Sequence, residues 1–329
     1  MKHKLSDRIR RGEPIEPPLS WLLSGATAFT RAGMGIRKLR PFVTVDADVI
    51  SVGNITAGGT GKTPAVIRYA KRGIAANVKV GILTRGYGTP QETSVVVSTD
   101  IDAADHYRKL GDEPAVILRH APEVVVFKAK DRVHAAQIAV NDHGCQVLIL
   151  DDGYQYLHLG RNDNILLIDA ENPFGNGHLL PRGYLREPVD AISRATHCIV
   201  TRCSDTADRA KIAETVRTHN PHCSIEWTRH SPTRLIHAQS NEDQPLDRFR
   251  GVKVVAACSI GNPEAFSKTL VEMGMIVQET RAYADHAPIP DDGFQGTLPV
   301  IVTEKDLVRT SSPPDNVYAL MVELETLPD

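Results

Sequence analysis

Short apolar runs alternate with longer segments of mixed polarity through the first two thirds of the chain. The runs lie at 49–52, 78–83, 124–127, 147–150, 165–168 and 198–200. Each is rich in Val, Ile and Leu at consecutive positions, which is typical of strands buried on both faces. The segments between them have the length of helices. The pattern therefore predicts an α/β fold in which a parallel sheet has helices on both faces.

The alternation breaks at 228–250, where charged residues and prolines replace the apolar runs. A second set of elements then begins, with a strand at 252–256, a helix up to Met273, a strand at 275–279 and strands near Val300 and Tyr318. A chain of 329 residues is long for a single core. We therefore predict a larger domain at 1–228 and a smaller α/β domain at 229–329.

The first apolar run leads into a glycine-rich turn, Gly-Asn-Ile-Thr-Ala-Gly-Gly-Thr-Gly-Lys-Thr at 53–63. A strand, a tight turn and a helix N-terminus in this order form a phosphate-binding loop, because backbone N–H groups and the helix dipole face the anion. In such a loop Lys62 reaches the β- and γ-phosphates and the Thr63 hydroxyl binds Mg²⁺. The generic motif has a glycine where Thr56 stands here. The residues predicted to bind the nucleoside triphosphate are Thr56, Ala57, Gly58, Gly59, Thr60, Gly61, Lys62 and Thr63.

Two aspartates, Asp151 and Asp152, directly follow the apolar run at 147–150. In parallel α/β sheets, ligands gather at the carboxyl ends of the strands. An aspartate in this place in a phosphate-loop enzyme holds Mg²⁺ directly or through water. We therefore predict that Thr63, Asp151 and Asp152 bind Mg²⁺.

Three further polar segments each have two interpretations. Gly111-Asp112-Glu113-Pro114 is a surface turn or a pair of functional carboxylates, and its proline biases Glu113 away from helical geometry. Asp285-His286 is a surface pair or shares a proton with a carboxylate from elsewhere in the chain. The segment 179–188 is a solvated loop or presents guanidinium groups to phosphate oxygens.

Composition narrows the classes of partner. Lys and Arg total 38 and Asp and Glu 40, which gives a formal net charge of -2. Such a balanced chain lacks the basic field of a nucleic-acid-binding protein, so we predict no nucleic acid partner. The five cysteines form no CxxC pair and are expected to be reduced thiols of a cytoplasmic protein.

The segment 19–42 is apolar at its start and basic at its end. Trp21, Leu22, Leu23 and Phe29 come first, and Arg31, Arg37, Lys38 and Arg40 follow. Only about a dozen residues precede Arg31, fewer than the roughly 20 that span a bilayer. The pattern predicts a helix at about 18–42. This helix lies in a membrane interface with its cations at the headgroups, or it packs on its own domain.

Together these motifs resemble the tetraacyldisaccharide 4'-kinases, which phosphorylate the lipid A precursor. The resemblance covers nearly the whole chain, in eight patches that keep one order. They are the N-terminal apolar and basic segment, 53–64, Thr84-Arg85-Gly86-Tyr87-Gly88, 111–114, Asp151-Asp152-Gly153-Tyr154-Gln155, 180–187, Asp285-His286 and Thr303-Glu304-Lys305-Asp306. Thr56 is shared with the family. Two places differ: Tyr154 and Tyr156 stand where Phe and His are common, and Ala287 stands where a second histidine commonly follows.

The resemblance implies a P-loop kinase domain joined to a smaller α/β domain by a short β linker, with ATP and Mg²⁺ as cofactors. It implies transfer of the γ-phosphate to the 4'-hydroxyl of a tetraacyldisaccharide 1-phosphate by a monomer on the cytoplasmic face of the inner membrane. Lys62, Asp112 and His286 are the catalytic residues that it implies, with Asp112 as the base and His286 as its partner. The implied substrate contacts are Arg85, Glu113, Gln155, Arg186 and Glu187. Because Asp112 and His286 fall in different predicted domains, domain closure is expected to assemble the pair.

Two other functions remain open from the sequence. Membrane-associated regulatory ATPases share Gly-Gly-x-Gly-Lys-Thr, but they place a lysine before the paired glycines, where this chain has Ala57. The second is a soluble small-molecule kinase whose N-terminal helix belongs to its core. Its activity would not depend on lipid or detergent.

Overall fold

The computed structural model describes residues 17, 19, 21–27, 41–86, 88–90, 92–204 and 207–328. Within them the chain packs into two compact units. Unit 1 comprises the described residues up to Arg85, Lys130–Arg229 and the end of the chain from Glu325. Unit 2 comprises the described residues of Gly86–Ala129 and of His230–Leu324.

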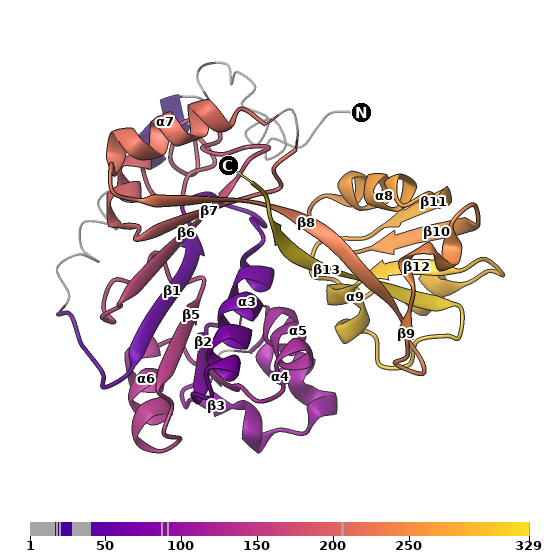
Figure 1. The fold of residues 1–329 in the computed structure, drawn as a ribbon, viewed down its shortest axis with the longest axis horizontal. Coiled ribbons are helices and arrows are strands. Elements are labelled where there is room, and N and C mark those ends of the chain that lie inside the picture. The colour runs from indigo at the N-terminus through magenta and orange to yellow at the C-terminus, as the bar shows by residue number, and fades with distance from the viewer. Residues whose placement is uncertain are drawn as a thin grey trace. The chain divides into compact units, whose positions relative to one another are not determined.

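Unit 1 contains a parallel sheet with β1 (Asp48–Asn54) in its middle (Figure 1). On one side β1 pairs with β5 (Val147–Asp151), which pairs in turn with β2 (Val80–Thr84). On the other side lie β6 (Asp163–Asp169), β7 (His197–Thr201) and the start of β8 (Ser224–His237). The inner strands are almost wholly buried, as their uninterrupted apolar runs predict.

Helices cover both faces of this sheet. The chain moves along the sheet in one direction through α3 (Lys62–Ala75) and in the opposite direction through α6 (Arg132–Asn141) and α7 (Arg209–His219). Because crossovers between parallel strands are right-handed, α3 lies on one face and α6 and α7 on the other (Figure 1). The short helix η3 (Val189–Arg194) packs against α7. The predicted α/β fold of the P-loop type is confirmed.

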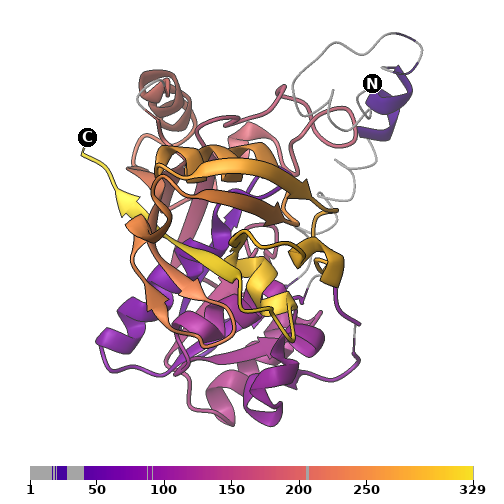
Figure 2. The same ribbon diagram turned by 90° about the vertical axis from the view of Figure 1, so that its right-hand side faces the viewer.

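Unit 2 contains a second parallel sheet (Figure 2). Its strands follow the order β11 (Ile276–Ala282), β10 (Lys253–Cys258), β12 (Val300–Thr303) and β13 (Val317–Thr326). The later part of β8 continues this order and pairs with β9 (Asp243–Gln244). The helix α8 (Pro263–Glu272) packs on β10 and β11, and α9 (Glu304–Arg309) packs on β12. Two short helices, η4 (Leu246–Phe249) and η5 (Asp291–Phe294), complete this part.

The segment 86–129 supplies the remaining elements of unit 2. These are β3 (Val96–Val97), η1 (Ser98–Asp100), η2 (Ala103–Asp105), α4 (His106–Leu110), α5 (Asp112–His120) and β4 (Val125–Lys128). The strands β3 and β4 are antiparallel, and α5 contacts both α4 and α9. The chain passes between the units at 85–86 and at 129–130, and again within β8 and within β13. The last two crossings lie in strands, in keeping with the short β linker that the resemblance implies. The domain boundary predicted between residues 228 and 229 stays a prediction.

Two local expectations from the sequence are wrong. The segment 228–250 does not interrupt the strands at its start, because β8 continues through it to His237 and buries Thr228, Leu235 and Ile236. Nor is Glu113 kept out of a helix: α5 begins at Asp112 and includes it. Pro114 is tolerated there because the N–H groups of a first helical turn have no partner within the helix.

The helix predicted at about 18–42 lies mostly outside the described residues. Residues 21–27 are helical, and the side chains of Trp21 and Leu22 are 71% and 70% exposed. Phe29 and the four basic residues of the segment are not among the described residues. None of the helices among the described residues has the length and hydrophobicity of a membrane-spanning segment. All five cysteines are described, and each is a buried thiol outside any disulfide.

Candidate active site

The glycine-rich turn of unit 1 connects the end of β1 at Asn54 to the start of α3 at Lys62. Gly58 and Gly61 have φ values of 95° and 80°, in the left-handed region that glycine adopts without steric cost. The backbone N–H groups at the start of α3 have no partner within the helix. The loop therefore has the conformation that a phosphate-binding loop requires.

Contacts from neighbouring segments hold this loop in place. The N–H of Ala57 donates to the carbonyl of Tyr184 at 2.8 Å. The Arg202 guanidinium donates to the carbonyl of Gly59 at 2.7 Å, and the Thr201 hydroxyl donates to that of Thr60 at 3.0 Å. A loop fixed in this way loses little conformational freedom when it binds a ligand.

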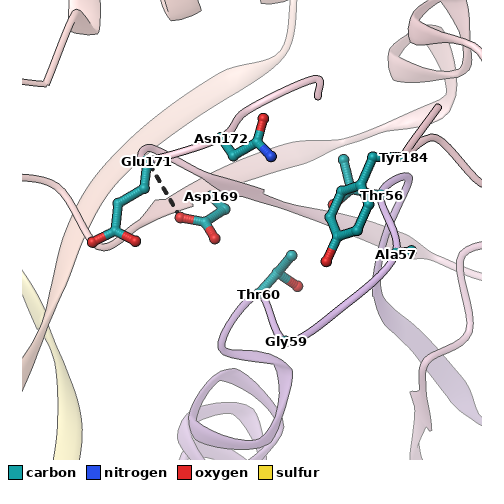
Figure 3. Close-up of a pocket in the computed structure, with 8 residues that line it drawn as sticks. All are labelled: Thr56, Ala57, Gly59, Thr60, Asp169, Glu171, Asn172 and Tyr184. Carbon is teal, nitrogen blue, oxygen red and sulfur yellow. Dashed lines mark hydrogen bonds between the residues drawn. The ribbon is translucent and has the colours of Figure 1, made fainter. Parts of the chain in front are cut away.

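A cavity lies directly beside the loop (Figure 3). Its lining residues are Thr56, Ala57, Gly59, Thr60, Asp169, Glu171, Asn172 and Tyr184. Asp169 is the last residue of β6 and forms an ion pair of 2.5 Å with Arg202. Asp169, Glu171 and Asn172 were not predicted from the sequence, although their position directly after the apolar run at 165–168 was a signal for them.

Lys62 and Asp152 form the charged part of this site. The Lys62 amine is buried, 3.4 Å from Asn54 Oδ1 and 3.6 Å from Asp152 Oδ1. Arg186 contacts both carboxylate oxygens of Asp152, at 3.0 and 2.8 Å. Burial alone would raise the pKa of Asp152, but the charges of Lys62 and Arg186 outweigh it and lower the pKa. Asp152 is therefore an anion shared by two cations.

The residues predicted to hold Mg²⁺ supply oxygen atoms only. Asp151 ends β5, is buried, and accepts a hydrogen bond of 3.3 Å from the Thr84 hydroxyl. Thr63 is buried in the first turn of α3. Hydroxyl and carboxylate oxygens are hard donors that fit Mg²⁺, which usually keeps water and phosphate ligands as well. Among the described residues, no group of three or more His, Cys, Asp or Glu side chains is placed so that it could hold a metal ion.

Gln155 and Glu187, predicted to contact the substrate, contact each other. The Gln155 amide donates to the carbonyl of Asn54 and to Glu187 Oε1, both at 2.9 Å. Arg194 donates to both oxygens of the buried Glu187, at 2.9 and 2.8 Å. This network ties the end of β1 to the segment 187–194. Arg85, at the end of β2, is exposed.

The two tyrosines that differ from the common family pattern both have partners. Tyr154 is fully buried, and its hydroxyl donates to the carbonyl of Ala191 at 2.7 Å. The hydroxyl of Tyr156 accepts from the N–H groups of Arg132 and Val133, at 3.0 and 3.2 Å, at the start of α6. Both hydroxyls therefore have hydrogen-bond partners within the protein.

Asp112 and His286 form a pair within unit 2. Asp112, the first residue of α5, is buried, so the interpretation as a surface turn is wrong. His286 follows β11 with φ at 65°, and its Nδ1 lies 2.9 Å from Asp112 Oδ2. Both residues line a cavity with Gly88, Thr89, Tyr107, Arg108 and Gly111. Because they belong to the same unit, the pair exists without closure of one domain on another.

Basic side chains surround the Asp112 carboxylate. Arg309, at the end of α9, contacts Asp112 Oδ2, and Lys305 pairs with the neighbouring Glu113 at 2.7 Å. Burial would raise the pKa of Asp112, but the His286 hydrogen bond and the charges of Lys305 and Arg309 hold it well below its usual range. The same hydrogen bond raises the pKa of His286 against the opposing effect of burial.

Comparison with known proteins identifies the family. Residues 15–329 match the family described as Tetraacyldisaccharide-1-P 4'-kinase. The chain belongs to this family. It is 35% identical to the tetraacyldisaccharide 4'-kinase of Anaeromyxobacter sp. (strain K), over 92% of this chain and 84% of the relative. It is also 35% identical to the tetraacyldisaccharide 4'-kinase of Geobacter sulfurreducens, over 93% of this chain and 87% of the relative.

A solved structure supports the same relationship. The crystal structure of LpxK from Aquifex aeolicus in complex with ATP is 26% identical and superposes with a TM-score of 0.72, over 94% of this chain and 93% of that one. The match to a kinase family confirms the prediction of an ATP-dependent kinase. It does not favour either the regulatory ATPase or the small-molecule kinase.

Proposed function

We propose that this chain transfers the γ-phosphate of ATP to the 4'-hydroxyl of a tetraacyldisaccharide 1-phosphate, a step of lipid A biosynthesis. The family match over residues 15–329 carries the proposal. Two features of the structure support it: a formed phosphate loop in unit 1 and a formed Asp112–His286 pair in unit 2. Phosphoryl transfer needs both charge neutralisation at the phosphates and a base for the acceptor hydroxyl.

At the nucleotide, residues 56–63 bind the phosphates and the Lys62 ammonium neutralises their charge as it is transferred. Thr63 and Asp151 would hold Mg²⁺, which would supply further positive charge to neutralise the phosphates. Asp152 has its oxygens engaged by Arg186 and Lys62, so we assign it the orientation of these two cations. The contacts of Gln155, Arg186 and Glu187 favour a supporting role beside the nucleotide for these three residues. Arg85 and Glu113 remain proposed substrate contacts.

The direct test incubates the purified protein with Mg²⁺-ATP and a tetraacyldisaccharide 1-phosphate dispersed in detergent. Mass spectrometry of the lipid should show one added phosphate, in amounts that match the ADP formed. ATP hydrolysis without a modified lipid would contradict the proposal and favour a regulatory ATPase. A non-acylated disaccharide 1-phosphate tests the small-molecule alternative, since a soluble kinase would phosphorylate it equally well.

Replacing Asp151 by Asn should raise the Mg²⁺ concentration needed for half-maximal activity. We expect an increase of at least about 10-fold, the lower end of the effect of weakened metal coordination. Asp152→Asn should change this requirement less and should instead raise the KM for ATP, because it releases Lys62 and Arg186. Asp163→Asn is the matched control, because Asp163 is the first residue of β6 and so lies at the opposite edge of the same parallel sheet. An unchanged Mg²⁺ requirement in Asp151→Asn would remove this residue from the metal site.

We also propose that the protein works as a monomer bound peripherally to the cytoplasmic face of the inner membrane. The acyl chains of such a substrate belong in a bilayer, so the enzyme must meet it at the lipid surface. The exposed side chains of Trp21 and Leu22 support this role, because aromatic and leucine side chains insert at the headgroup level. The basic residues Arg31, Arg37, Lys38 and Arg40 would add attraction to anionic lipids.

Replacing Trp21, Leu22 and Phe29 together by Ser should release the protein from anionic vesicles in a co-sedimentation assay. Salt should also weaken binding, since each basic residue contributes about 1 kcal/mol near such a surface. The double variant Val271→Ser and Ile276→Ser is the control, because it removes exposed apolar side chains of 55% and 50% exposure from unit 2. Wild-type protein that never sediments with vesicles would contradict the membrane proposal.

A further inference from the structure

Arg161 connects the turn that follows β5 to the strands β1 and β6. Its Nη1 donates to Ser51 Oγ at 3.0 Å, to Asn164 Oδ1 at 3.1 Å and to the carbonyl of Gly153 at 3.3 Å. Its Nη2 donates to the carbonyl of Tyr156. Ser51 belongs to β1 and Asn164 to β6, so one guanidinium joins the turn to two strands of unit 1.

The four acceptors of Arg161 are neutral oxygens: two backbone carbonyls, a hydroxyl and a side-chain amide. Burial lowers the pKa of Arg161 to about 10, so the side chain keeps its charge at neutral pH. A guanidinium presents several N–H donors in one rigid plane, which suits it to hold several carbonyl oxygens in a fixed arrangement. Its contacts therefore act on the shape of the turn.

The turn has a backbone conformation that needs support. Asp152 has φ at 50°, in the left-handed region, which costs free energy for a residue with a Cβ atom. Gly153 is packed so closely that a Cβ atom there would lie 2.5 Å from Leu150 Cβ and 2.8 Å from Ser51 Oγ. Such a conformation persists only where surrounding contacts determine it, and Arg161 supplies two of these contacts at the carbonyls of the turn.

The same turn directs two side chains towards the phosphate loop. The Asp152 carboxylate lies 3.6 Å from the Lys62 amine and 2.8 Å from the Arg186 guanidinium. The Gln155 amide donates to the last carbonyl of β1 at 2.9 Å. The two carbonyls that accept from Arg161 belong to the residues directly after Asp152 and Gln155 in the chain.

We propose that Arg161 is a positioning residue of the nucleotide site, which holds the turn at 152–156 so that Asp152 meets Lys62 and Arg186. This inference rests on the proposed role of Asp152 beside the nucleotide. Without Arg161 the turn is no longer fixed in advance, so ATP has to order it on binding. The cost of that ordering lowers the affinity for ATP.

The experiment compares wild type with Arg161→Met and Arg161→Lys. Arg68→Met is the matched control, because Arg68 also lies in unit 1 and forms an ion pair of 2.6 Å with Glu226. The two side chains of this pair are only 15% and 18% exposed. Its loss should lower the stability of unit 1 through the contact between α3 and β8, and not through the turn.

Two readouts are measured without the lipid acceptor. One is the Kd of a non-hydrolysable ATP analogue with Mg²⁺, by titration calorimetry. The other is amide hydrogen exchange in peptides that cover 152–156, by mass spectrometry. Exchange reports on the turn because the N–H of Gly153 donates to the carbonyl of Val52 at 3.0 Å and the N–H of Tyr156 to the carbonyl of Gly153 at 2.9 Å.

Arg161→Met should bind the analogue about 10–100-fold more weakly, the usual effect of losing a group that orients a ligand-binding side chain. Its turn should exchange faster, while the KM for the lipid acceptor stays unchanged. Arg161→Lys keeps the charge but offers one nitrogen to four acceptors, so it should recover only part of the affinity. Arg68→Met should lose thermal stability but keep the wild-type Kd and the wild-type exchange at 152–156.

Three results would overturn the inference. The first is a folded Arg161→Met with wild-type Kd, or with weaker binding but unchanged exchange in the turn. The second is an equal loss of affinity in Arg161→Met and Arg68→Met, which would trace the effect to stability. The third applies if Arg161→Met does not fold, and is an Arg161→Lys with wild-type Kd and exchange.

Failure of the proposed function is seen separately. A wild type that modifies no lipid would defeat that proposal, and both readouts on Arg161 can still be measured because neither uses the acceptor. An Asp152→Asn variant with wild-type Kd would remove Asp152 from the nucleotide site and overturn the inference with it.

Discussion

Lys62→Ala should lower kcat by about 10²–10³-fold or more at saturating ATP, the loss seen when one transition-state donor is removed. The Lys62 ammonium is buried between Asn54 and Asp152, so no water can easily take its place. The variant leaves Asp152 and Arg186 paired without the amine, so a direct fluorescence titration should show weaker ATP binding as well. Thr63→Ala should cause a similar loss in kcat through Mg²⁺.

Lys71→Ala is the control for the charge change, because Lys71 is exposed and lies on the same helix, α3. It should keep wild-type kcat and KM. Turnover close to wild type in Lys62→Ala at saturating ATP would show that the loop serves only the fold. Circular dichroism shows whether each variant is folded, so it distinguishes a loss of activity from a loss of structure.

Asp112→Ala and His286→Ala should each lower kcat by about 10²–10⁴-fold, the usual contribution of a general base. The KM for ATP should stay nearly unchanged, since neither residue belongs to the phosphate loop. If the two residues act as one unit, the double variant should be little worse than the poorer single variant. The measurement is a double-mutant cycle on kcat with the lipid acceptor.

His237→Ala is the control for this cycle. His237 also lies in unit 2 and contacts an aspartate, with Nε2 at 2.7 Å from the carbonyl and 3.4 Å from the carboxylate of Asp315. It does not line the cavity of Asp112 and His286, so its kcat should match wild type. Fully multiplicative losses in the cycle would mean that Asp112 and His286 have independent roles.

The phosphate loop could be predicted because the structural elements that form it are contiguous in the chain. A buried strand, glycines able to adopt positive φ and a helix start follow one another within residues 48–63. Asp151 at the end of β5 and Asp152 directly after it were predictable for a related reason, because parallel strands end at the same edge of a sheet. The helical conformation of Glu113 could not be predicted in this way. A proline usually biases the preceding residue away from helical geometry, but Pro114 lies in the first turn of α5, where a proline is tolerated.

Sequence patterns alone could not predict the pair formed by Asp112 and His286. Asp112 and His286 are 174 residues apart, and each stands in a motif that reads equally well as a surface turn. Only the resemblance to a family linked them, while the domain boundary predicted from the strand and helix pattern separated them. In the structure α5 packs against α9, the segment after β11 brings in the imidazole, and all three belong to unit 2.

The sequence by itself therefore determined the alternation of strands and helices, the phosphate loop and the carboxylates at the strand ends. These depend on backbone geometry and burial, which neighbouring residues specify. The tertiary structure alone decided that Asp152 is shared by Lys62 and Arg186, that Gln155 and Glu187 face each other, and that Arg309 meets Asp112 across 197 residues. The ionisation of a carboxylate depends on the charges and donors that packing brings to it, and no local pattern encodes those.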